Sequence, residues 1–310
     1  MNIVQLFRSF LEYKKPLCKK STLGTYSALF GKLCRTGIVD GEMDAENFDS
    51  TVLQNIYDQC KASGQSERTA RDICTLMKNI IHTSALQGLC SHRLLQIRYS
   101  REGYGGGDIL KVYRKDEISE IFGWLEANPH FWTLGVYIAV YTGARIGEVC
   151  GLKWSDVDFH GKTIHVERTV ERVFNFEGQG TSVEISTAKT RSSNRLLPLS
   201  KNLERILKKW FPVSRPEFYI TSNSTRPIEP RLMRDRFVDA CQNAGVRYKG
   251  FHSLRHTFAT MMLESGVDIK TISDILGHSG VEITMNIYSH PSDTSKRKAV
   301  EKTFKKLRFE

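Results

Sequence analysis

The chain has 310 residues, about the length of two average domains, and 40% of its residues are hydrophobic. This composition excludes a disordered chain and provides enough apolar side chains for a substantial core. Lysine and arginine total 45 against 34 aspartates and glutamates, so the formal net charge is +11. A basic balance of this size favours a polyanionic partner, nucleic acid first, although many soluble proteins are also mildly basic.

Cysteine usage and the apolar stretches indicate the cellular setting. The seven cysteines are scattered and include no C-x-x-C pair, so the sequence predicts reduced thiols and no metal site. The N-terminus has charges too early for a secretory signal, and the most apolar stretch, residues 132–144, is too short to cross a bilayer. We therefore expect a cytoplasmic protein without a membrane partner. The cysteines are Cys18, Cys34, Cys60, Cys74, Cys90, Cys150 and Cys241.

Residues 3–98 carry apolar side chains at three- and four-residue steps, the spacing of an amphipathic helix. The sequence predicts four or five short helices here, one of them running from Ser66 to about Leu86, and no strand. The candidate N-cap residues are Ser21 or Thr22, Asp49 or Ser50, and Ser66. The basic residues of this part could meet phosphates or form an ordinary solvated face. The candidate DNA-binding residues among them are Lys14, Lys15, Lys19 and Lys20.

The stretch 100–114 combines glycines with charges and interrupts the helical spacing, as an exposed connection between two domains does. We therefore predict an all-α domain at residues 1–99, a linker at 100–114 and a mixed α+β domain at 115–310. In the second domain, β-branched and aromatic runs between Thr163 and Leu199 predict a small antiparallel sheet. Helices are predicted near 115–127, 130–141, after Gly143, and near 200–209, 230–244, 252–265, 268–276 and 281–288, followed by a C-terminal tail helix.

Arg145 and Glu148 stand three residues apart in TGARIGEVCGLKW, so on a helix they share a face and the carboxylate can hold a neighbouring donor. Such a pair by itself is usually an exposed ion pair. A second segment, FHSLRHTFATMMLESG, predicts a helix with His252 and Arg255 on a face turned away from the core. Ala259 shares that face, and the predicted core face carries Leu254, Phe258, Met261 and Met262.

Two more candidates follow further along the chain. In IKTISDILGHSG the helix should end at Gly277, a residue type that caps helix C-termini, and leave His278 just beyond its end. Tyr288 lies in VEITMNIYSHP, immediately before the S-H-P break. Each of these side chains by itself is more often structural. Together, two guanidinium groups, two imidazoles and a phenol in a basic protein fit metal-free phosphoryl transfer at a phosphodiester.

Through TGARIGE, HSLRHTFATMMLESG, LGHS and NIYSH the sequence resembles the tyrosine recombinase family, also called the phage integrases. These motifs occur in the family's order and approximate spacing, and the resemblance covers about residues 115–290. The helical front end is similar, by its pattern alone, to the family's core-binding domain, a SAM-like helical bundle. The resemblance implies a site-specific DNA recombinase of the phage or mobile-element type that acts in integration or excision.

The resemblance also implies a role for each candidate. Tyr288 would attack the scissile phosphate and give a 3′-phosphotyrosyl link with a free 5′-hydroxyl, a step that needs no cofactor. Arg145 and Arg255 would hold the charge that develops on the non-bridging oxygens. His252 and His278 would add hydrogen bonds to the phosphate and assist proton movement.

Other residues would support this reaction. Glu148 would orient the neighbouring catalytic residues without contacting the DNA itself. Lys189, in STAKTRSSNRLLPL, matches the family's lysine on a β-hairpin that protonates the departing 5′-oxygen. Arg191 and Arg195 nearby would contact the DNA backbone. The stretch 169–187 is long for a simple hairpin, which suggests an inserted β element that contacts DNA or a neighbouring subunit.

The implied partners are double-stranded DNA and further copies of the chain, in a homo-tetramer that holds two DNA sites and passes through a Holliday junction. The basic tail, with Val300, Phe304 and Leu307 on one stripe, would pack on a neighbouring protomer or fold back on its own domain. Accessory DNA-bending or excision factors fit the same scheme. The alternatives are a type IB topoisomerase, a telomere resolvase, and a DNA-binding protein that has this fold without the catalysis.

Overall fold

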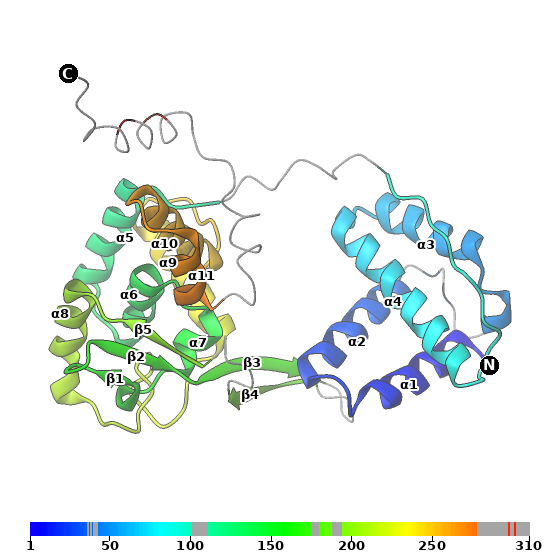
Figure 1. Cartoon of the computed structure of the whole chain (residues 1–310), viewed down its shortest axis with the longest axis horizontal. Helices are drawn as coiled ribbons and strands as arrows, with labels where there is room; N and C mark the ends of the chain where they lie inside the picture. The colour runs from blue at the N-terminus through cyan, green and yellow to red at the C-terminus, as the bar shows by residue number, and fades with distance from the viewer. Residues whose placement is uncertain are drawn as a thin grey trace, which may run out of the picture. The chain divides into compact units, whose positions relative to one another are not determined.

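The structure, a computed structural model, describes residues 1–35, 37, 39, 43–100, 111–174, 180–187, 194–277, 297 and 301 (Figure 1). The chain divides into two compact units, Met1–Gly107 with Arg172–Ser182, and Asp108–Glu171 with Val183–Glu310. Each unit has a hydrophobic core of its own. The domain limits at residues 99 and 115 stay a prediction.

Helices form the first unit. Within the described residues these are α1 (Ile3–Lys14), α2 (Lys20–Cys34), the 3-10 helix η1 (Ala45–Asn47), α3 (Ser50–Ala62) and α4 (Glu67–Leu86). Asp49 and Ser66 accept hydrogen bonds from backbone amides in the first turns of α3 and α4, so these two predicted N-caps are confirmed. Lys19, rather than Ser21 or Thr22, precedes α2, and it makes no side-chain capping bond. Each α-helix buries apolar side chains in one core, as the three- and four-residue spacing predicts.

Residues 89–100 form no regular secondary structure, but side chains bind them to the first unit. The side-chain amide of Gln54 accepts a hydrogen bond from the backbone N–H of Arg98 at 3.0 Å and donates one to its C=O at 3.1 Å. Glu67 accepts hydrogen bonds from the hydroxyls of Tyr57 and Ser100. The chain therefore packs with this unit as far as Ser100.

The second unit combines helices with a small sheet. Its described elements are α5 (Lys115–Ala127), α6 (Phe131–Thr142), α7 (Ile146–Gly151), η2 (Trp154–Asp156), β1 (Val157–Asp158), β2 (Thr163–Val166), β5 (Arg195–Pro198), α8 (Lys201–Trp210), η3 (Phe211–Val213), α9 (Pro230–Asn243), α10 (His252–Glu264) and α11 (Ile269–Leu276). Strands β3 (Arg168–Phe174) and β4 (Thr181–Thr187) belong to it only in part, because residues 172–182 are grouped with the first unit. Strands β1, β2 and β5 pair antiparallel in that order, with Ile164 opposite Leu197. Strands β3 and β4 form a separate sheet, where a single sheet was predicted. The predicted helix at 281–288 lies outside the described residues, as does the tail apart from Arg297 and Glu301.

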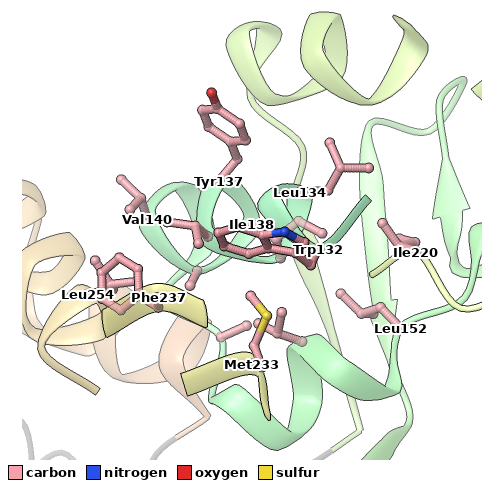
Figure 2. Close-up of a cluster of buried hydrophobic side chains, with 14 of the residues drawn as sticks. Trp132, Leu134, Tyr137, Ile138, Val140, Leu152, Ile220, Met233, Phe237 and Leu254 are labelled. Carbon is pink, nitrogen blue, oxygen red and sulfur yellow. The ribbon is translucent and has the colours of Figure 1, made fainter. Parts of the chain in front are cut away.

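Helix α6 lies at the centre of the second core, and its sequence FWTLGVYIAVYT is apolar on all sides, as a fully covered helix requires. Figure 2 shows Trp132 and Ile138 of α6 beside Met233 of α9. Helices α8 and α10 also pack against α6. Because α6 is packed against other helices on every side, the turn at its C-terminal end, at Gly143, is held in a fixed position. No described helix is long and apolar enough to span a membrane.

Candidate active site

The turn between α6 and α7 is where three helices meet. Gly143 ends α6 in the left-handed conformation, with φ at 68°. A Cβ at this position would lie 2.6 Å from Leu276 Cδ2 and 2.7 Å from Phe258 Cδ1, so glycine allows α11 and α10 to approach the turn. The Gly143 carbonyl accepts a hydrogen bond from Arg255 Nη1 at 2.9 Å. The TGAR segment thus connects α6, α10 and α11 at one backbone position.

Glu148, in the first turn of α7, accepts hydrogen bonds from the backbone and the side chain of Arg145, the N-cap residue. The Arg145 backbone N–H donates to Glu148 Oε2, and Arg145 Nη1 donates to Glu148 Oε1, both at 2.9 Å. Arg145 Nη2 donates to the carbonyl oxygen of Gly277 at 3.2 Å. The Arg145 side chain is 40% exposed, whereas that of Glu148 is 7% exposed. The buried Glu148 carboxylate therefore fixes one edge of the Arg145 guanidinium and leaves the rest of that group accessible to solvent.

Arg195 reaches the same carboxylate from strand β5. Its Nη1 and Nη2 donate to Glu148 Oε1 and Oε2, each at 2.9 Å, and its Nε donates to the carbonyl oxygen of Ile275 at 2.8 Å. The Arg195 side chain is only 8% exposed. The predicted contact of Arg195 with the DNA backbone does not fit this geometry, because all three side-chain nitrogens are bonded to protein acceptors. These acceptors lie 47 and 80 residues away in the chain, beyond the reach of any local pattern.

Glu148 is ionised in spite of its burial. Burial raises the pKa of this carboxyl, but the hydrogen bonds and charge of Arg195, followed by those of Arg145, outweigh it and lower the pKa to about 2. Two guanidinium groups and one carboxylate leave one net positive charge on the cluster. Since Arg195 is buried and Arg145 is partly open, that charge faces solvent at Arg145.

Helix α10 carries the next candidates and is covered on both faces. Arg255 is 2% exposed and Ala259 is fully buried, whereas Met261 is 36% exposed. The prediction that this face of the helix points away from the core was therefore wrong for Arg255 and Ala259, and so was the core position of Met261. The physical reason is that α10 packs against both α6 and α11.

His252 lies in the first turn of α10 and remains exposed. Its ring meets that of His256 edge to face, with 4.7 Å between centroids. Partial removal from water lowers the pKa of His252, and the charges of His256, Arg255 and Arg145 lower it further, to about 4. The imidazole is therefore neutral at pH 7 and has one N–H to donate. Sequence reasoning passed over His256, although a position four residues after His252 is the spacing of contact on a helix.

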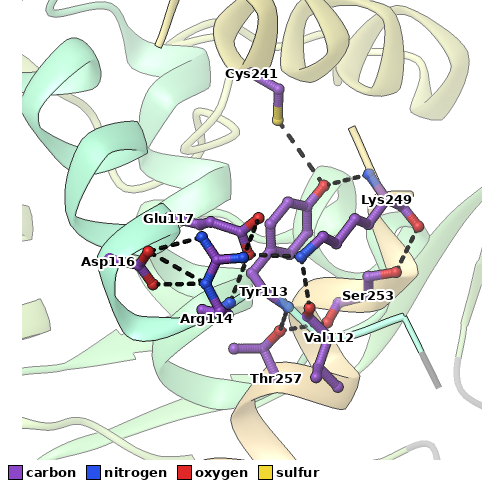
Figure 3. A network of polar contacts seen from close by, with 9 residues as sticks. All are labelled: Val112, Tyr113, Arg114, Asp116, Glu117, Cys241, Lys249, Ser253 and Thr257. Atoms are coloured by element: carbon purple, nitrogen blue, oxygen red, sulfur yellow. Dashed lines mark hydrogen bonds and ion pairs between the residues drawn. The ribbon is translucent and has the colours of Figure 1, made fainter. Parts of the chain in front are cut away.

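A buried polar network fixes α10 against residues 112–114 (Figure 3). Thr257 Oγ1 accepts a hydrogen bond from the Tyr113 amide at 2.8 Å, and the Lys249 amide donates to the Tyr113 hydroxyl at 2.9 Å. Lys249 Nζ also pairs with Glu117 at 2.5 Å. Tyr113 is 3% exposed and belongs to the hydrophobic core of the second unit. Val112 and Tyr113, which lie within the predicted linker, are thus bonded to this unit.

The described residues bring several predicted site residues together. Arg145, Glu148 and Arg195 are joined by hydrogen bonds, Arg255 binds the turn that leads into α7, and His252 lies within electrostatic reach of Arg255 and Arg145. The candidates outside the described residues are Lys189, Arg191, His278 and Tyr288. In the described part of the chain, no three His, Cys, Asp or Glu residues are grouped so that they could hold a metal ion.

The four lysines predicted to bind DNA lie around a single turn of the first unit. Lys14 is the last residue of α1, and Lys15 is its C-cap. Lys19 is the N-cap of α2, and Lys20 is its first residue. Lys14 Nζ lies 5.6 Å from the centre of the Phe10 ring. The turn from α1 to α2 therefore concentrates positive charge in a short stretch of backbone.

A protein family, curated relatives and solved structures all match this chain. Residues 111–295 match the Phage integrase family. A "Tyrosine recombinase XerC-like" protein of Caldanaerobacter subterraneus subsp. tengcongensis is 29% identical over 276 residues, which cover 81% of this chain and 70% of that protein. The Tn1549 transposon integrase in complex with transposon right end DNA has a TM-score of 0.79 at 20% identity, over 98% of this chain and 99% of that chain. A lambda integrase tetramer bound to a Holliday junction has a TM-score of 0.66 at 18% identity, over 94% and 80% of the two chains.

The family match covers more than half of the chain and includes the described residues Arg145, Glu148, His252 and Arg255. The two integrase structures share its helix-rich fold with small sheets. The chain belongs to the phage integrase family. It is a tyrosine recombinase, an enzyme that cleaves and rejoins DNA, and the resemblance drawn from the four sequence motifs is confirmed.

Proposed function

We propose that the chain catalyses site-specific DNA recombination, in integration or excision, through attack of the Tyr288 hydroxyl on a scissile phosphate. The phenolic oxygen bonds to phosphorus, the 5′-oxygen of the next nucleotide leaves, and the 3′-phosphotyrosyl link conserves the bond for rejoining. The observation that carries this proposal is the convergence of Arg145 and Arg255, distant in sequence, at the turn after α6 in a member of the phage integrase family.

Arg145 and Arg255 would stabilise the charge on the non-bridging oxygens as phosphorus becomes five-coordinate. Glu148 holds Arg145, and the Gly143 carbonyl holds Arg255, so both guanidinium groups are ordered before DNA arrives. Prior ordering reduces the entropy lost when a phosphate binds. Planar guanidinium groups also match two phosphate oxygens at once, which an ammonium group does not.

Proton movement would fall to side chains around the same phosphate. His252, neutral at pH 7, would donate a hydrogen bond to a phosphate oxygen or accept the proton of Tyr288. His278 would add a second imidazole, since it follows Gly277, whose carbonyl binds Arg145. Lys189 would give its proton to the departing 5′-oxygen.

Double-stranded DNA is the proposed substrate, with phosphate contacts from the lysines of the α1–α2 turn and from Arg191. The net charge of +11 supports this partner. Two DNA sites would be held by a homo-tetramer that passes through a Holliday junction, with the C-terminal tail packed on a neighbouring protomer. Accessory DNA-bending or excision factors would select the direction of the reaction, and the reaction would take place in the cytoplasm.

A covalent trap tests the nucleophile. Nicked duplexes drawn from the DNA that flanks the gene are incubated with the protein in the presence of a metal chelator and separated on a denaturing gel. The wild type should form a protein–DNA adduct, because the nick releases the short 5′ fragment and prevents rejoining. Tyr288→Phe should form none, whereas Tyr13→Phe, at an exposed tyrosine of α1, should form as much adduct as the wild type.

The other outcomes have separate meanings. Sequence-specific binding without an adduct would contradict catalysis and favour a binding protein of the same fold. Adduct formation by Tyr288→Phe would assign the reaction to another nucleophile. Relaxation of supercoiled plasmid without exchange between two sites would favour topoisomerase activity.

A further inference from the structure

Glu148 is a buried carboxylate shared by two arginines. It accepts four hydrogen bonds: two from Arg145, through the backbone N–H and Nη1, and two from Arg195, through Nη1 and Nη2. Both of its oxygens are therefore fully used. Of the two arginines, Arg145 is 40% exposed and Arg195 is 8% exposed. One arginine is thus open to an anion and the other is enclosed.

We propose that Arg195 is a positioning residue that neutralises Glu148 and so keeps the charge of Arg145 available to the scissile phosphate. This inference rests on the proposed function of the site. It replaces the role that the sequence suggested for Arg195, a contact with the DNA backbone.

The charge balance of the cluster supports this role of Arg195. With Arg195 present, the cluster of two guanidinium groups and one carboxylate keeps one net positive charge. Without Arg195, Glu148 and Arg145 would form a neutral pair, and the buried carboxylate would compete with the phosphate for Arg145. A bidentate arginine is the side chain that saturates both carboxylate oxygens in a fixed plane. Arg195 therefore lets Glu148 orient Arg145 without cancelling its charge.

The contacts of both arginines at the end of α11 support the same role. A helix leaves its last carbonyl groups without partners inside the helix. Arg195 Nε binds the carbonyl of Ile275 at 2.8 Å, and Arg145 Nη2 binds that of Gly277 at 3.2 Å. Cations at this end of a helix also interact favourably with its dipole. The arginine pair thus fixes the chain at the residue that directly precedes His278.

The proposal predicts the behaviour of three variants. Arg195→Gln should lower the single-turnover cleavage rate about 10- to 100-fold, as the loss of an orienting partner typically does. The double variant Glu148→Gln/Arg195→Gln should cleave faster than Arg195→Gln, because removal of the carboxylate returns the charge to Arg145. Arg195→Lys keeps the charge but loses the bidentate geometry, so its rate should lie between those of the wild type and Arg195→Gln.

Two measurements separate this inference from the proposed function. Cleavage is measured on the nicked duplex that gives the most adduct with the wild type. Independently of DNA, inorganic phosphate is titrated at low salt while the Arg145 Nε–Hε signal is followed by NMR. Arg195→Gln should bind phosphate at least about tenfold more weakly than the wild type, and the double variant should recover binding. If the wild type binds phosphate but forms no adduct, the proposed function fails while the phosphate titration still tests Arg195.

DNA affinity distinguishes a positioning role from a DNA contact. Arg195→Gln should change the affinity for the duplex by less than about threefold, because all three side-chain nitrogens of Arg195 already donate to Glu148 and to the carbonyl of Ile275. A lost phosphate contact would instead lower affinity and reduce the slope of log K against log salt by about 1. Arg205→Gln, at an exposed arginine of α8, is the matched control and should leave the cleavage rate unchanged.

Several results would overturn the proposal. The first is a folded Arg195→Gln variant that cleaves DNA and binds phosphate as well as the wild type does. Another is a double variant that is folded by circular dichroism but no better than Arg195→Gln in either measurement. If Arg195→Gln does not fold, the double variant decides by itself: cleavage within about tenfold of the wild type supports the charge argument, and a folded but inactive double variant contradicts it.

Discussion

At Gly143 the backbone reverses from α6 into α7 with φ at 68°, and its carbonyl binds Arg255. The same residue lies where Leu276 and Phe258 would contact any added Cβ. One position therefore meets a conformational need, a packing need and a hydrogen-bonding need. The sequence motif TGAR contains this glycine two residues before Arg145 because the turn and the arginine belong to one local structure.

Gly143→Ala should destabilise the second unit and displace Arg255. The left-handed backbone costs an alanine roughly 1–2 kcal/mol, and the contacts with Leu276 and Phe258 add to this. Thermal denaturation measures the change. Gly123→Ala is the matched control, because that glycine lies within α5 with open space around its Cβ position; it should be neutral or stabilising by up to about 1 kcal/mol. Equal midpoints for the two variants would contradict this account of Gly143.

His252 should titrate well below the ordinary histidine pKa of 6.5. Its surroundings favour the neutral imidazole and lower the pKa to about 4, so the ring should stay neutral as the pH falls from 7 to about 5. This preference contributes to stability above pH 6.5, and the contribution is lost as the pH falls through about 4. Bound phosphate should raise the pKa, because its negative charge favours the imidazolium. NMR titration, with His252→Asn to assign the signal, tests this; a midpoint at or above 6.5 in the free protein would contradict it.

Among the elements, α10 differs most from its sequence-based description. Its limits were predicted well, at 252–265 against the observed His252–Glu264. The choice of its buried face was wrong, because a helical pattern assumes one covered and one open face, whereas α10 packs against both α6 and α11. The polar residues Ser253, Arg255 and Thr257 are consequently buried and bonded to other segments.

Thr257→Val should destabilise the second unit by about 1–3 kcal/mol, because the nearly isosteric change leaves the buried Tyr113 amide without its acceptor. Thr257→Ser keeps the hydroxyl and loses one methyl group, so its cost should be about 1 kcal/mol or less. Chemical denaturation of both variants provides the comparison. A serine variant as unstable as the valine variant would show that the methyl contact, rather than the hydrogen bond, secures Tyr113.

At the scale of the whole molecule, the two units have separate cores and separate polar anchors. The segment that leaves the first unit is bound through Gln54 and Glu67 as far as Ser100. The segment that enters the second unit is bound through Tyr113. Each anchor uses groups of its own unit, so Ser100 and Tyr113, both within the predicted linker, pack with the first and the second unit respectively.

Fragments 1–100 and 111–310 should therefore each fold when expressed alone. Each should show a cooperative thermal transition, since each contains one complete apolar cluster and its anchoring side chains. A second fragment that begins at residue 115 should be less stable than 111–310, because it lacks the buried Tyr113. A first fragment without a cooperative transition would show that its core depends on the rest of the chain.

The sequence by itself determined the kinds of element and most of their limits, along with the chemistry of the site residues. Periodicity, the caps at Asp49 and Ser66 and the glycine at 277 depend on neighbours within a few residues, so they can be read locally. Only the tertiary structure decided the burial of Arg255 and the partners of Arg195. Those properties depend on contacts between segments far apart in the chain, where packing of α10 between two helices and the shared carboxylate of Glu148 override the local pattern.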